Sequence, residues 1–148
     1  SAFEWCSVAP NPDRAPLYRL QKGDTQDFAR AVSCHQEIAA DGAFSVGMLA
    51  KFDPVLDQQG PAAYRHLFWE TGIIGQMLYL GAEAAGVRGT GIGCFYDDLM
   101  HRALGLADRS WQSLYHFTIG GPVEDPRLVT LPPYDHLADR RGGSRGLS

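Results

Sequence analysis

A glycine-rich segment, GTGIGCF at residues 89–95, is the stretch whose spacing most suggests a bound ligand. Its glycines alternate, and alternate residues of a strand lie on one face. A strand without side chains on one face leaves a backbone edge against which a flat ring could lie, facing the N–H groups. Cys94 stands where a dinucleotide fingerprint needs its third glycine, and the Gly-Lys-Ser/Thr of a phosphate-binding loop is missing. The residues equally allow that the glycines make room for a packed helix.

Cysteine and histidine chemistry is a second hypothesis. The neighbours Cys34 and His35 could form the nucleophile and base of a cysteine-dependent hydrolase, but nothing marks Cys34 or Cys94 as an activated thiolate. Three cysteines, with Cys6 the third, are an odd number in apolar surroundings and predict reduced thiols in a cytoplasmic protein. The five histidines lack partners at metal-ligand spacing, so we predict no metal site.

Charge and length exclude other classes. The 148 residues carry 13 Lys and Arg against 17 Asp and Glu, a formal net charge of −4. No basic face is wide enough to bind nucleic acid. The longest apolar stretch is too short, and too charged at its ends, to span a bilayer, so we predict no membrane partner. A chain of this length buries roughly two thirds of its unfolded surface in a single core.

Helices and strands mix along the chain. We expect strands at residues 3–8, 17–20, 43–50, 89–95 and 113–119, the first two forming a hairpin and the third buried. One short helix is expected to be capped by Asp24 or Thr25. Another is expected to be capped by Asp97 or Asp98 and to stop at Gly105.

The longest predicted helix covers residues 62–85 and is closed by Gly86. Its central part carries no charge and has apolar residues on every face, so we expect it to be buried all round. Gly72, Gly75 and Gly81 lower its helix propensity, which makes sense where another backbone approaches closely. A helix at the centre of a homodimer meets this need, and so does a core helix of a monomer.

The two ends differ in composition. Residues 138–148 are rich in glycine, serine and charge, so we expect a flexible tail after a single domain at residues 1–137. The chain opens without Met on a strand-like segment, which suggests that an upstream portion is missing.

Several short motifs occur in an order and at a spacing shared with a known family. They are LYR at 17–19, YR at 64–65, WETG at 69–72, GQMLYL at 75–80, GIGCF at 91–95, DD at 97–98, LGL at 104–106, LY at 114–115 and IG at 119–120. In these motifs the chain resembles the FMN-dependent nitroreductase superfamily, and within it the SagB-type dehydrogenase branch, which includes oxidases that turn azolines into azoles in modified peptides. The resemblance covers roughly residues 17–134, so the chain would be the C-terminal portion of such a protein.

The resemblance implies an α+β fold, in which an antiparallel or mixed sheet is flanked by helices. It also implies a homodimer whose long central helices pack at the interface, with the FMN sites between subunits. It places the backbone of Gly91, Ile92, Gly93 and Cys94 against flavin N5 and O4. Arg127 is the nearest candidate for the FMN phosphate.

The implied function is an FMN-dependent oxidoreductase. In this family flavin N5 accepts a hydride and passes electrons to or from a small-molecule or peptide substrate, with NAD(P)H as a candidate donor. We identify no catalytic acid or base. The sequence lacks the family's Arg-x-Ser-x-Arg and Pro-Ser-Gly segments, and Met77 replaces a frequent asparagine. This absence motivates the alternative of a flavin-free interaction subunit that keeps the fold and the dimer helix.

Overall fold

The computed structural model of the chain describes residues 6–7 and 17–137. The tail expected at 138–148 lies outside the described residues, as does most of the strand expected at 3–8. The remainder of that strand, β1 (Cys6–Ser7), pairs antiparallel with β2 (Tyr18–Arg19), so the predicted early hairpin is confirmed.

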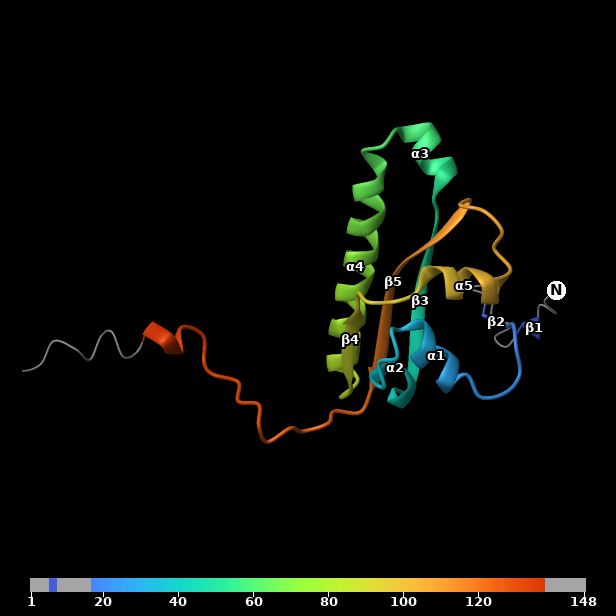
Figure 1. Cartoon of the computed structure of the whole chain (residues 1–148). Helices are drawn as coiled ribbons and strands as arrows, with labels where there is room; N and C mark the ends of the chain where they lie inside the picture. Colours follow the sequence, from blue (N-terminus) through green and yellow to red (C-terminus); the bar gives the residue numbers. More distant parts are fainter. Residues whose placement is uncertain (1–5, 8–16, 138–148) are drawn as a thin grey trace, which may run out of the picture.

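A three-stranded antiparallel sheet forms the centre of the fold (Figure 1). Its middle strand is β5 (Trp111–Gly120), which pairs with β3 (Phe44–Lys51) on one side and with β4 (Arg88–Ile92) on the other. Aromatic and β-branched residues favour strands, and β5 is rich in both. The two outer strands each leave one edge unpaired within the described chain.

Helices cover both faces of this sheet (Figure 1). The long helix α4 (Ala63–Ala84) packs on one face, where Gly75 meets the Tyr115 ring. On the other face lie α1 (Gln26–Val32), α2 (Ile38–Asp41) and α5 (Asp97–Leu104). A short helix, α3 (Asp53–Gln59), links β3 to α4, and a 3-10 turn, η1 (Asp135–Leu137), ends the described chain. The predicted α+β architecture is therefore correct.

Side chains of β5 alternate between these two layers, as the period of a strand requires. Phe117 is fully buried and packs with Met48 and Ala82 toward α4. On the opposite face Thr118 Oγ1 donates to the carbonyl of Ile38 in α2, at 3.2 Å. His116 is also buried there, and its Nε2 lies 3.0 Å from Ser113 Oγ.

The helix ends follow the local signals in most cases. Gly86 and Gly105, which follow α4 and α5, have positive φ angles of 72° and 69°, so a backbone conformation suited to glycine ends both helices. The predicted cap of α5 was wrong by one or two residues. Tyr96 occupies the N-cap without a side-chain hydrogen bond, and Asp97 and Asp98 lie in the first turn, where carboxylates favour the helix dipole.

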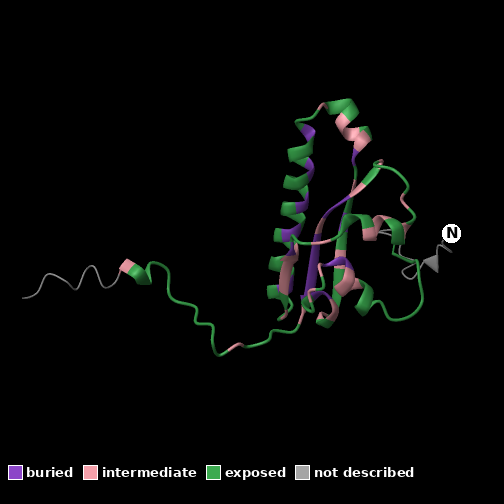
Figure 2. Cartoon of the chain, in the orientation of Figure 1, coloured by how far each residue is buried: buried purple, intermediate pink, exposed green. Residues whose placement is uncertain are grey.

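Two predictions of burial were wrong for the single chain (Figure 2). The helix α4 buries one stripe against the sheet, whereas side chains such as Ile73 and Met77 are more than half exposed, at 62% and 67%. The strand β3 lies at an edge of the sheet, and only Met48 in it is buried. Both errors arise because local apolarity does not tell which side of an element its own chain covers. No helix among the described residues is long and apolar enough to cross a membrane.

Burial of His116 makes the stability of the fold sensitive to acid. Desolvation lowers the pKa of this imidazole, so the unfolded chain takes up a proton at a higher pH than the folded chain does. Above the pKa of His116 in the unfolded chain, about 6.5, the imidazole is neutral in both states and this stability is fully present. As pH falls below that value, the unfolded chain takes up the proton first and the stability is lost. We expect urea unfolding to show a lower free energy at about pH 5.5 than at about pH 7.5, and His116→Gln to reduce that difference. The exposed control His66→Gln should keep it, and an unchanged pH dependence in His116→Gln would contradict the assignment.

Candidate functional site

The segment 91–94 lies where β4 leaves the sheet. Gly91 is paired with Phe117 and Ile92 with His116 in the last two positions of the ladder. The Ile92 side chain is 2% exposed and anchors the segment in the core, whereas Gly93 and Cys94 are exposed. The segment therefore consists of a fixed first half and an open second half.

The first two alternating glycines serve packing. A Cβ on Gly89 would lie 2.7 Å from the Phe117 ring, and one on Gly91 would overlap the Tyr115 hydroxyl. The Gly91 N–H also donates to the Tyr79 hydroxyl of α4, at 2.8 Å. For Gly89 and Gly91 the interpretation that glycine admits a packed neighbour is therefore correct.

Gly93 differs from the other two glycines. A Cβ placed on it would meet no atom within 4 Å, so its backbone borders open space. The Gly91 N–H, by contrast, is taken up by the Tyr79 hydroxyl. Gly93 follows the last ladder pair and lies just outside β4. The side of Gly93 on which a side chain would stand is therefore open.

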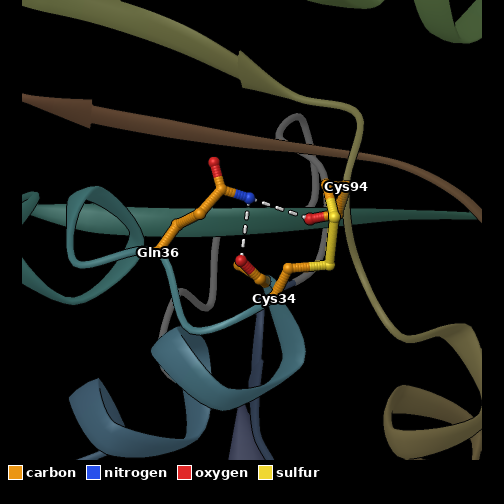
Figure 3. Close-up of a disulfide and its surroundings, with 4 residues drawn as sticks. Cys34, Gln36 and Cys94 are labelled. Atoms are coloured by element: carbon orange, nitrogen blue, oxygen red, sulfur yellow. Dashed lines mark hydrogen bonds between the residues drawn. A yellow bond between two sulfur atoms is a disulfide. The ribbon is translucent and has the colours of Figure 1, made fainter.

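Cys94 is bonded to Cys34 in a disulfide, so the prediction of reduced thiols was wrong for this pair (Figure 3). The two residues are 60 positions apart, and their Cα atoms lie 5.9 Å apart, within the usual range for a disulfide. The fold brings the turn after α1 beside the exit of β4, which no local pattern reveals. A bonded Cys34 cannot act as the free nucleophile of a cysteine hydrolase.

Several residues that sequence reasoning missed shape this region. Tyr79 holds the Gly91 amide, and Gln36 Nε2 donates to the carbonyl of Cys94 at 3.0 Å. Phe95 stacks on the His116 ring, with centroids 4.3 Å apart. Burial, together with the nearby Tyr79, raises the pKa of Tyr115. A tyrosine on a helix face or a glutamine in a connecting segment carries no sequence signal for such contacts.

Arg127 is not brought to the glycine segment. It lies after β5, in the stretch that extends away from the sheet in Figure 1. Its Nε and Nη2 donate to the Asp125 carboxylate at 2.8 and 2.6 Å. This pair lowers the pKa of Asp125 and raises that of Arg127.

An open cavity of about 600 Å³ lies at the other end of β4. Arg88, Thr90 and Glu124 are among its lining residues, but Gly93 and Cys94 are not. Arg88 is also paired with Glu83 at 2.9 Å. Among residues 6–7 and 17–137, no group of three histidine, cysteine or acidic side chains could bind a metal.

Comparison with known proteins connects this geometry to a family. Residues 4–121 match the model of the nitroreductase family. No curated protein matches the chain.

Solved structures with a similar fold include flavin enzymes. A protein of Anabaena variabilis, provisionally classed as a nitroreductase, is 26% identical, with a TM-score of 0.67 over 73% of this chain and 22% of that one. The NADPH:FMN oxidoreductase of Vibrio harveyi, solved with NAD+, is 17% identical, with a TM-score of 0.58 over 84% of this chain and 56% of that one. An FMN-dependent nitroreductase of Clostridium difficile is 11% identical, with a TM-score of 0.53 over 80% of this chain and 69% of that one. The chain spans less than two thirds of the Anabaena and Vibrio proteins.

The contrast between Gly91 and Gly93 gives a direct test of the site geometry. Gly91→Ala should lower the free energy of unfolding by about 1–3 kcal/mol, because the added methyl overlaps the Tyr115 hydroxyl. Gly93→Ala, the matched control, should change it by less than about 0.5 kcal/mol, because its methyl enters open space. Chemical denaturation measures both values. Equal losses would show that Gly93 is covered.

Proposed function

The chain belongs to the nitroreductase family, and from this premise we propose that it is the flavin-facing part of an FMN-dependent oxidoreductase. The names of the Vibrio harveyi and Clostridium difficile relatives both include FMN, which supports the cofactor. The sequence motifs favour a SagB-type dehydrogenase, of which the chain is a C-terminal portion. Its substrate would be a small molecule or a modified peptide, with NAD(P)H as a candidate donor.

The observation that carries the proposal is the open backbone at Gly93. A flat ring needs a surface without side chains and with hydrogen-bond donors at its edge, and Gly93 offers the first of these just beyond the end of β4. Only the second half of the segment 91–94 is open to a flavin ring. Gly91 donates its N–H within the chain, so Gly93 and Cys94 are the residues that would face the ring.

The chain's own residues would hold and orient the ring. Ile92 is buried in the core, and Gln36 donates to the Cys94 carbonyl, so the backbone at Gly93 is held on both sides. Bound FMN supplies hydride and electron transfer, and the protein contributes position and hydrogen bonding. The residue that follows the segment is held as well, because the Phe95 ring stacks on the buried His116 ring.

Arg127 remains our candidate for the phosphate of FMN. An arginine fork binds carboxylate and phosphate groups alike, and Arg127 already holds a carboxylate on two of its nitrogens. To reach a cofactor at Gly93, the stretch after β5 would fold against this chain or a second copy. A phosphate would then replace Asp125 as its partner.

A second copy of the chain would bury the large apolar surface of α4 that the other described residues leave exposed. The large apolar residues of α4 that stay exposed are Tyr64, Phe68, Trp69, Ile73, Ile74, Met77, Tyr79 and Leu80. An apolar patch of this kind marks an interaction surface. Gly72 and Gly81 face open space on the same helix, which allows another backbone to approach. We therefore propose a homodimer formed through α4.

One observation favours the alternative of a flavin-free interaction subunit. The Gly91 N–H and Arg127, both assigned to FMN by the resemblance, have partners within the chain, Tyr79 and Asp125. A protein that no longer binds FMN would keep α4 as its docking surface. Flavin binding separates the two hypotheses.

Blocking the open backbone should remove flavin binding. In the longest protein that contains this chain, Gly93→Val should weaken FMN binding by at least about tenfold, because the isopropyl group occupies the space of the ring. Gly121→Val, where an added Cβ also meets open space, is the matched control and should bind FMN normally. Quenching of flavin fluorescence gives the affinity. Failure of the unmodified protein to bind FMN would favour the interaction subunit.

Charge on the exposed stripe of α4 should break the proposed dimer. Ile73→Glu changes a side chain that is 62% exposed in the single chain, so the fold should survive while dimerisation weakens by at least about tenfold. Phe28→Glu places the same charge at an exposed site on α1 and should leave the dimer intact. Sedimentation equilibrium measures both. A monomeric parent protein would refute the interface.

A further inference from the structure

The Cys34–Cys94 disulfide joins two parts of the fold that otherwise belong to different layers (Figure 3). Cys34 lies in the turn after α1, one residue beyond its C-cap Ser33. Cys94 lies two residues beyond the end of β4 and next to Gly93. The bond therefore lies directly beside the open segment.

Other contacts hold the same two segments together without the sulfurs. Gln36 Nε2 donates to the carbonyl of Cys94 at 3.0 Å and to that of Ser33 at 2.8 Å. The Tyr96 N–H donates to the carbonyl of Val32 at 2.7 Å. These links span both sides of the disulfide, so the two sulfurs would stay close to each other after the bond opens.

Neither cysteine of the bond is buried, and the backbone at Cys34 is unusual. Cys94 is exposed and Cys34 is partly exposed, whereas disulfides that resist reduction are commonly shielded. Cys34 and His35 both have left-handed φ angles, 54° and 58°, a conformation that costs energy in residues other than glycine. The His35 N–H donates to the Arg30 carbonyl at 2.9 Å, so a backbone contact at the end of α1 holds this turn in addition to the disulfide.

We propose that Cys34 and Cys94 form a reversible dithiol–disulfide pair that exchanges with small-molecule thiols. The sulfur of Cys94, the more exposed residue of the pair, is the point of entry. The proposal concerns thiol chemistry and does not depend on whether FMN binds.

The exchange balances as two steps. A thiolate attacks Cys94 Sγ, the S–S bond breaks, and the electron pair leaves on Cys34 Sγ, which takes up a proton. A second thiolate attacks the external sulfur of the mixed disulfide and releases Cys94 as a thiolate. Two external thiols are oxidised to one disulfide, and the protein disulfide is reduced to two thiols.

Thiol counting in a chain with Cys6→Ser tests reversibility, because only the pair then remains. We expect air-equilibrated protein to bind no N-ethylmaleimide by mass spectrometry. After equilibration with about 5 mM reduced glutathione it should bind two, with its circular dichroism unchanged. Treatment with glutathione disulfide should restore the protein that binds no N-ethylmaleimide. A pair that opens only in denaturant, or a reduced protein that does not re-form the bond, would overturn the proposal.

Single-cysteine variants test the point of entry. In the same background, Cys94 of Cys34→Ser should form a mixed disulfide with glutathione disulfide several-fold faster than Cys34 of Cys94→Ser. Equal or reversed rates would overturn the assignment of Cys94.

In the two-cysteine chain, Gln36→Leu should slow re-formation of the bond several-fold, because it removes the link to the Cys94 carbonyl. Gln58→Leu, at an exposed site on α3, should not, and equal rates in the two would refute the tethering role of Gln36.

Discussion

The close packing of α4 on a glycine-lined part of the sheet is the contact on which the rest of the structure depends. Gly75 of α4 admits the Tyr115 ring, with only 3.0 Å between its would-be Cβ and that ring, and Gly89 admits Phe117 in the same way. Residues with a Cβ at these places would push the layers apart. Because β4 is held between α4 and β5, it ends at a fixed position, and Gly93 emerges from the sheet with its backbone open.

The same contact decides what α4 leaves exposed. A helix with apolar residues on every face can turn only one stripe to a three-stranded sheet, so residues such as Ile73, Met77 and Leu80 remain in water in the single chain. Their exposure is a consequence of the packing, and a second copy is the cover that the family premise suggests. The proposed cofactor site and the proposed dimer thus follow from one arrangement of helix and sheet.

The sequence anticipates those parts of this structure that depend on local signals. Gly86 and Gly105 mark helix ends, and the aromatic, β-branched residues of β5 mark a strand, because backbone conformation and side-chain shape act over a few residues. Contacts between distant segments left no such signal. The partners of Cys34, the Tyr79 hydroxyl on the Gly91 amide and the different surroundings of Gly91 and Gly93 all arise from the packing of layers. The partner of Arg127 was missed although Asp125 is only two residues away, because many side chains could serve an exposed arginine.

A crystal structure of the protein grown with FMN tests the central claim most directly. We expect an isoalloxazine ring against the backbone of Gly93 and Cys94, within hydrogen-bond distance of an amide, and a second copy packed on α4. A ring bound elsewhere in the molecule, or a bound ring beside an α4 surface that no second copy covers, would contradict it.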